Sequence, residues 1–527
     1  MDQNRRRLLI SLGYGAASVA TLGALGVGRD PSAPPRPGPS DAPPPGLAAT
    51  EEVNVAGTTQ VRPGSLVPPV LDPSLQADPS TQFDVVITGG RVMDPATGFD
   101  NQMNVGVLGK VIAYIGTEQL TGATTIDASS QVVAPGFVDI LSYRPNPFGV
   151  WFKVADGVTT NLGMHGINNY ANAFFERFTG AVPVNFGGAF HQQFHRGLLD
   201  VSPDREMNST QLAQFEQLAA EQLADGFAGV AFSPEYAPGT TREEILRVAE
   251  QAAGQGGVLF FHARHSDNEA PGTNAEAIAE VLDVARTTGL GVHVSHITST
   301  GGTFTMGETL NTLNQARSDG VDVTACIYPY DFWATRVGSF RFAGDWRSRF
   351  GLDYGDLQIG GTETRLTAET FPAAQAENKL VAALGSIPSE EVDQAMATPW
   401  IMVASDAIAE PDGNNHPRAA GTFARTLGVY VRERKILTLM DALAKMTILP
   451  ARRVEGMLPA MARKGRLQIG ADADITVFDP NTVIDRATVA APATASAGIS
   501  NVLVNGVGVL ENGELRQERL PGEALRS

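Results

Sequence analysis

Eight apolar runs of strand length recur between residues 132 and 405, and helical patterns fill most of the gaps between them. The runs are 132–140, 157–162, 182–190, 228–233, 257–262, 289–296, 322–330 and 400–405. The clearest helical patterns are 211–224, 242–253, 275–286 and 308–318. Buried strands that alternate with helices favour a parallel α/β sheet, and eight of them favour a (β/α)8 TIM-type barrel. An open doubly wound sheet is the alternative.

Two local features refine this pattern. Thr240 and Thr241 each have a glutamate three residues further on, which is a capping-box signal for a helix start. The segment 331–399 separates the seventh and eighth runs and is too long for a simple connection. We expect it to hold helices and a loop that covers the barrel mouth.

Short strand-like runs and turn pairs also lie on both sides of the barrel region. Each side has too few strands to close its own core, so both are expected to form one small β-sandwich. The turn pairs are Gly89-Gly90, Asp94-Pro95, Gly109-Lys110, Asn505-Gly506 and Asn512-Gly513. The expected divisions are a signal at 1–28, a Pro-rich linker and lead-in at 29–82, sandwich at 83–134, barrel at 135–463, sandwich at 464–515 and a tail at 516–527.

The N-terminus has the composition of an export signal. Arg5-Arg6 precede Leu8-Leu9, and a Gly-interrupted apolar stretch continues to residue 28. This pattern predicts a twin-arginine signal and a periplasmic or extracellular protein without a membrane span after the signal is removed. A membrane anchor formed by residues 8–28 is the alternative. Residues 30–48 are rich in Pro, Ser, Ala and Gly, which predicts a linker.

Composition excludes several classes of function. Lys and Arg number 39 and Asp and Glu number 57, so the net charge is −18. Because a phosphate backbone needs a cationic face, nucleic acid is not an expected partner. The single Cys326 excludes an intrachain disulfide and a Cys-rich metal cluster. A small-molecule substrate is the expected partner, and a homo-oligomer is a further possibility.

All eight histidines fall within the expected barrel, and three of them lie at the carboxyl ends of strands. These are His165, His262 and His296, and Asp406 follows the last strand. Barrel enzymes build their active sites from such strand ends. A zinc-type ion takes three protein ligands, keeps a position open for water and lowers the pKa of that water to about 7. Structural histidines at strand ends are an equally weighted interpretation.

Other polar residues have weaker assignments. Glu235 follows the fourth strand, and a buried structural role is favoured over a role as an extra ligand. His265 is either a substrate contact or an exposed residue. His293 is expected on the opposite strand face from His296. His191 and His195 follow the third strand, and they are expected either at the barrel mouth or in a loop.

Several short motifs occur in a fixed order through residues 83–515. They include Val-Ala-Pro-Gly-Phe-Val-Asp at 133–139, Asp-Gly-Val-Thr-Thr at 156–160, Tyr328-Pro329-Tyr330, Ser405-Asp406, His416-Pro417-Arg418 and Gly421-Thr422-Phe423. With these motifs the chain resembles the amidohydrolase superfamily and, within it, the N-acyl-D-amino-acid deacylases. The resemblance implies a barrel with a small β-sandwich built from both chain ends.

The resemblance also implies a metal site, with two departures. The family's first strand ends in Asp-x-His-x-His, whereas Leu141 and Tyr143 stand at the two histidine positions here. The deacylases carry a Cys ligand where this chain has His165. The expected centre is therefore one zinc ion held by His165, His262 and His296, with Asp406 as the catalytic carboxylate.

The resulting functional hypothesis is a mononuclear hydrolase of a non-peptide amide C–N bond. Tyr328 or Tyr330 is expected to stabilise the developing oxyanion, and Arg418 to pair with a substrate carboxylate. The deacylases use a Lys where Thr298 stands, so a cyclic amide or another acyl amide is an alternative substrate. A non-catalytic exported binding protein on the same scaffold is the second hypothesis, and a nucleobase-type deaminase is the third.

Overall fold

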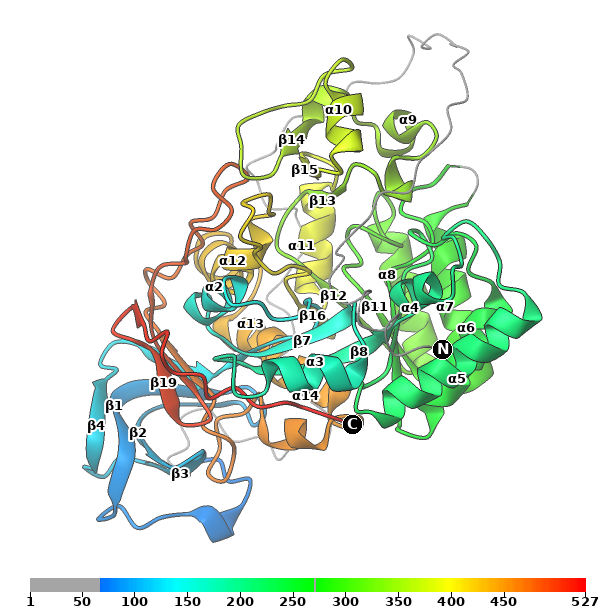
Figure 1. Ribbon diagram of the computed structural model, residues 1–527. Coiled ribbons are helices and arrows are strands. Elements are labelled where there is room, and N and C mark those ends of the chain that lie inside the picture. Colours follow the sequence, from blue (N-terminus) through cyan, green and yellow to red (C-terminus); the bar gives the residue numbers. More distant parts are fainter. Residues whose placement is uncertain (1–66, 270–271) are drawn as a thin grey trace. The chain divides into compact units, whose positions relative to one another are not determined.

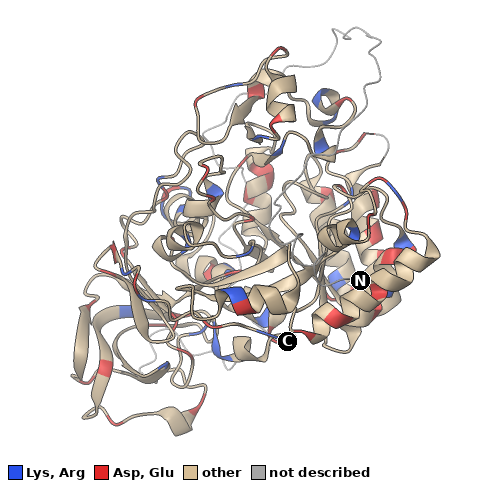
Figure 2. Ribbon diagram, viewed as in Figure 1, with Lys and Arg blue, Asp and Glu red and all other residues tan. Residues whose placement is uncertain are grey.

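The computed structural model describes residues 67–269 and 272–527, which belong to one compact unit. The expected signal and most of the expected linker lie outside the described residues. Among the described residues, no helix is both long and apolar enough to cross a membrane. Lys and Arg positions are interspersed with Asp and Glu positions along the ribbon rather than gathered on one face in the view of Figure 2.

Eight parallel strands form a nearly closed sheet in the order β16-β12-β11-β10-β9-β8-β7-β6 (Figure 1). Strands that follow one another in the chain are neighbours in the sheet, which confirms the predicted barrel. Their bounds are β6 Phe137–Asp139, β7 Val158–Ile167, β8 Asn185–His191, β9 Val230–Phe232, β10 Val258–Phe261, β11 Gly291–Val294, β12 Val323–Ile327 and β16 Ile401–Val403. The helices of the barrel region are α2 Gly149–Ala155, α3 Ala171–Phe178, α4 Gln192–Leu198, α5 Ser209–Ala224, α6 Arg242–Ala253, α7 Asn274–Thr288, α8 Met306–Ser318, α11 Ser389–Ala397, α12 Arg418–Arg425, a π-helix Thr426–Glu433, α13 Leu439–Met446 and α14 Ile448–Val454.

Side chains close the barrel between its first and last strands. Asp139 accepts hydrogen bonds from the Ser405 N–H at 3.0 Å and from the buried Lys153 Nζ at 2.7 Å. The Asp406 N–H donates to the Leu141 carbonyl at 2.7 Å across the same seam. These bonds fix the strand end that carries Asp406 relative to the strand end that carries Leu141.

The chain ends meet in a second sheet, with strand order β20-β19-β18-β17-β5-β1-β2-β3 and with β4 paired to β1. One apolar core includes residues from both segments, such as Val92 and Phe99 from one and Ile469 and Val477 from the other. The strands are β1 Gln82–Asp94, β2 Phe99–Leu108, β3 Val111–Gly116, β4 Thr121–Asp127, β5 Val132–Pro135, β17 Ile475–Phe478, β18 Ile499–Val504, β19 Val507–Glu511 and β20 Glu514–Leu515.

Two local predictions about these strands were wrong. The run 132–140 is two strands, because the chain leaves the small sheet after Pro135 and enters the barrel at Phe137. Any side chain at Gly136 would collide with the Thr159 side chain at 2.2 Å, so the crossing needs a glycine. The Gly89-Gly90 pair is a bulge inside β1 rather than a turn, with Gly89 at a φ of +66°.

The segment between β12 and α11 folds into a small insertion. It contains a three-stranded antiparallel sheet that the sequence did not predict, together with short helices. The elements are β13 Trp333–Arg336, a 3₁₀ turn Phe340–Phe342, α9 Trp346–Phe350, a 3₁₀ turn Tyr354–Asp356, β14 Leu357–Ile359, α10 Phe371–Ala376 and β15 Leu380–Ala383. Aromatic rings such as Trp333, Phe342 and Trp346 pack against one another in it. Two of its side chains, Thr335 and Arg341, reach partners of the barrel histidines.

Candidate metal centre

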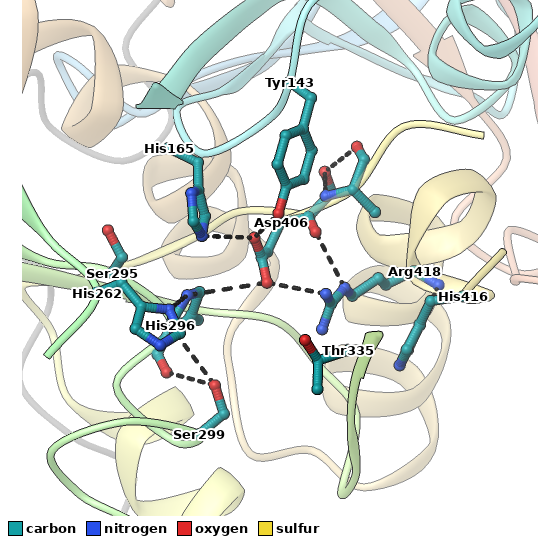
Figure 3. Close-up of polar contacts among 12 residues, drawn as sticks. Tyr143, His165, His262, Ser295, His296, Ser299, Thr335, Asp406, His416 and Arg418 are labelled. Atoms are coloured by element: carbon teal, nitrogen blue, oxygen red, sulfur yellow. Dashed lines mark hydrogen bonds and ion pairs between the residues drawn. The ribbon is translucent and has the colours of Figure 1, made fainter. Parts of the chain in front are cut away.

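His165, His262 and His296 converge at the carboxyl end of the barrel. One nitrogen from each ring lies within 4.8 Å of a nitrogen from each of the others, and all three residues are buried. His165 lies near the end of β7, whereas His262 and His296 follow β10 and β11. In Figure 3 their rings turn toward one another and toward Asp406.

The hydrogen-bond partners of two of these histidines determine which ring nitrogen carries the proton and which presents a lone pair to the centre of the cluster. His262 Nε2 is 2.6 Å from the Glu235 carboxylate, which can only accept a hydrogen bond, so Nε2 carries the proton. His296 Nδ1 is 3.1 Å from the Ser299 hydroxyl, which itself donates to the His296 carbonyl. The two remaining nitrogens, His262 Nδ1 and His296 Nε2, are 3.0 Å apart. Two unprotonated nitrogens at this separation can both bind one cation through their lone pairs.

Burial favours the neutral form of the His165 and His296 rings. It lowers the pKa of His165 and lowers the pKa of His296 well below its usual value. Neutral imidazoles are the form that binds a metal. The donor set therefore fits a zinc-type ion, which accepts three imidazole ligands in a hydrolytic site.

Asp406 lies beside the three histidines. Its Oδ1 is 3.7 Å from His165 Nε2, and its Oδ2 is 3.9 Å from His296 Nε2. Burial would raise the pKa of Asp406, but the Arg418 guanidinium, 2.9 Å from Oδ2, and the three histidines together outweigh burial, and the pKa falls to about 2. The carboxylate is therefore ionised at neutral pH.

The backbone is unusual at two of these positions. His296 has a φ of +32° and Asp406 a φ of +49°, a region that non-glycine residues occupy rarely. Such conformations persist where the surrounding structure holds them, and they concentrate at functional sites.

Tyrosines line the histidine cluster. Tyr143 stacks on His165 with ring centroids 5.2 Å apart, and Tyr236 packs on His262 at 4.4 Å. Tyr328 lies next to the His296 ring at 6.3 Å and beneath the Arg418 guanidinium. Tyr330 is turned elsewhere, toward Arg425 and Asp485.

The remaining histidines lie outside the three-nitrogen cluster. His191 is hydrogen-bonded to Asn168, with its ring centroid 6.4 Å from that of His165. His195 Nδ1 bonds the His191 carbonyl, and His293 Nδ1 bonds the Thr324 hydroxyl. The other two are His265, which is half-buried, and His416, which stacks on Phe332.

Sequence reasoning missed Ser299 and Arg341. Ser299 follows His296 by three residues, and that spacing could have suggested it as a partner. Arg341 lies in the insertion, 106 residues after Glu235, and no sequence signal relates the two.

Comparisons with known proteins agree with this geometry. A model described as "Amidohydrolase family" matches residues 372–510. N-acyl-D-glutamate deacylase of Alcaligenes xylosoxydans xylosoxydans is 33% identical over 84% of this chain and 97% of its own length. The solved N-acyl-D-glutamate deacylase of Bordetella bronchiseptica, complexed with zinc and a phosphonate inhibitor, is 29% identical, with a TM-score of 0.71 over 85% of this chain and 100% of that one. A D-aminoacylase structure described by one-metal activation and second-metal attenuation is 25% identical, with a TM-score of 0.73 over 84% of this chain and 100% of that one.

Proposed function

This chain belongs to the amidohydrolase superfamily, in its D-aminoacylase-like branch, and from that premise we propose that it hydrolyses the amide C–N bond of an N-acyl-D-amino acid with one zinc ion. The pair of inward-facing nitrogens on His262 and His296, 3.0 Å apart, is the observation that carries the proposal. His165 would be the third ligand. When bound, zinc lowers the pKa of a coordinated water to about 7 and polarises the amide carbonyl.

Asp406 is the proton acceptor in this proposal. A carboxylate with a pKa of about 2 stays ionised, and Arg418 and Tyr143 hold its two oxygens in place. Asp406 takes the proton of the attacking water and returns it to the leaving nitrogen, which is general base and then general acid catalysis.

Tyr328 is our choice for the residue that stabilises the oxyanion. Burial raises the pKa of Tyr328, so the phenol keeps its proton and can donate a hydrogen bond to the negative charge that develops on the carbonyl oxygen. Tyr330 also keeps its proton, but it faces Asp485 and Arg425 rather than the histidines.

Arg418 is the proposed contact for the substrate carboxylate. Its Nη2 and Nε already bond Asp406, so the substrate carboxylate would bind to the remaining N–H groups of the guanidinium. Thr298 carries no charge that could assist Arg418, so we expect only a modest affinity for the substrate carboxylate. A neutral or cyclic amide is the second candidate substrate for the same reason.

A substrate panel tests the function. The purified chain is assayed with N-acetyl-D-amino acids, their L-enantiomers and a hydantoin, before and after metal removal by a chelator. We expect release of free D-amino acid that the chelator abolishes and added zinc restores. Hydrolysis of the hydantoin alone would reassign the substrate to cyclic amides. A chain that binds no zinc and cleaves none of these compounds would point to a binding protein instead.

A further inference from the structure

We propose that Arg341, which the insertion carries, is a positioning residue for the metal centre, because it holds the hydrogen-bond partners of two histidines at once. The proposal rests on the proposed zinc site. It assigns to the insertion a role in metal binding, whereas the sequence predicted only a segment that covers the barrel mouth.

The first connection runs through Glu235. The Arg341 Nη1 donates to Glu235 Oε2 at 3.2 Å, and the same oxygen accepts the His262 Nε2 proton at 2.6 Å. The Ser266 hydroxyl donates to the other oxygen at 2.6 Å. Because Glu235 Oε2 accepts the hydrogen bond from His262 Nε2, the other ring nitrogen, Nδ1, faces His296.

The second connection runs through Ser299. The Arg341 Nη2 donates to the Ser299 carbonyl at 2.7 Å. The hydroxyl of the same residue lies 3.1 Å from His296 Nδ1 and accepts its proton. Because a guanidinium is planar and rigid, the spacing between its two nitrogens fixes Glu235 relative to Ser299. The orientation of both imidazoles therefore depends on one side chain.

The insertion places this guanidinium accurately. Arg341 is 2% exposed, and its guanidinium carbon lies 4.3 Å from the Trp333 ring centroid and 5.0 Å from that of Phe350. Both rings belong to the insertion. Partners of histidine ligands orient the imidazole and raise its basicity, and their loss costs about 10–100-fold in metal affinity.

The competing explanation is that Arg341 only anchors the insertion. Arg349 on α9 provides a matched control, because its guanidinium bonds the buried Asp267 at 2.9 Å and 3.0 Å. Asp267 contacts none of the three histidines through any hydrogen bond of the described residues. Arg349→Met therefore removes a comparable anchor without changing a histidine partner.

The experiment measures zinc affinity by chelator competition and the visible absorption spectrum of the Co²⁺-loaded protein for Arg341→Met, Arg341→Lys, Glu235→Gln and Arg349→Met. We expect about 10–100-fold weaker zinc binding and an altered Co²⁺ spectrum in the first three, and neither change in Arg349→Met. Arg341→Met and Glu235→Gln should be non-additive when combined, because they break one network.

Equal zinc affinities and identical Co²⁺ spectra in Arg341→Lys and Arg349→Met would overturn the proposal. If the arginine variants do not fold, the same two measurements on Glu235→Gln decide the proposal. Failure of the proposed function would give a different result, namely an unmutated chain that binds no zinc.

Discussion

The phenol of Tyr143 donates a hydrogen bond to Asp406 Oδ1 at 3.2 Å. Tyr143 follows the first barrel strand and Asp406 follows the last, and the Tyr143 ring also stacks on His165. Tyr143 stands where the family's first-strand motif has its second histidine. It therefore contacts the proposed proton acceptor directly.

Restoring that motif should create a second metal site. Leu141→His with Tyr143→His supplies two imidazoles next to Asp406, so we expect about two zinc ions per chain instead of about one. Metal content after gel filtration measures the change. Tyr143→Phe, the matched control, removes only the hydroxyl and should stay at one ion. Two ions in the unmutated chain would contradict the mononuclear site.

His165 should be replaceable by another zinc ligand but not by an apolar residue. We expect His165→Ala to lose zinc affinity by more than about 100-fold, since a direct ligand outweighs an outer partner. His165→Cys should keep the ion, because a thiolate binds zinc at least as well as imidazole does. Chelator competition measures both. Equal affinities for the two variants would show that position 165 is not a ligand.

Asp406→Asn should separate catalysis from metal binding. The amide cannot accept the proton, so kcat should fall by about 10²–10⁴-fold while zinc remains bound. Steady-state kinetics together with metal content tests this. Asp393→Asn is the control, because it alters another buried carboxylate, on α11, which is paired with Arg434, and it should leave kcat unchanged. Unchanged kcat in Asp406→Asn would exclude the assigned role.

Stability should depend on pH through Lys445. Burial lowers the pKa of Lys445 from 10.5 to about 7, and its amine donates to the carbonyls of Thr398 and Ile401. Between these two values the unfolded chain binds the proton more tightly, so stability rises with pH from about 7 toward 10. Thermal unfolding of Lys445→Met across this range should lack that rise. A parallel rise in both proteins would rule out Lys445 as its source.

Export is a separate proposal, which concerns residues outside the described structure. Replacing Arg5 and Arg6 by Lys keeps the charge but removes the paired guanidinium signature, so we expect transport to stop. Cell fractionation with immunodetection measures the distribution. Periplasmic accumulation of the double variant at the unmutated level would reject the twin-arginine assignment, and retention of the unmutated chain in the membrane would favour an anchor.

The sequence alone determined the barrel and the residues of the histidine cluster. Strand-length apolar runs alternate with helical patterns, and this periodicity specifies parallel strands because it is encoded locally. The rule that barrel active sites lie at carboxyl strand ends then selected His165, His262, His296 and Asp406. The helix over residues 242–253 was predicted from its pattern and its Thr241 cap, and it begins and ends at those residues.

Only the tertiary structure decided the contacts between segments that are distant in the chain. The switch of sheets at Gly136, the bond from Tyr143 to Asp406 and the reach of Arg341 to Glu235 depend on how separate elements pack. No periodicity relates residues 106 positions apart, as Arg341 and Glu235 are. Local patterns fix which strands and helices form. The partners of each buried polar group are fixed by the packing of those elements, because a buried donor, acceptor or charge must find its partner in whatever part of the chain lies beside it.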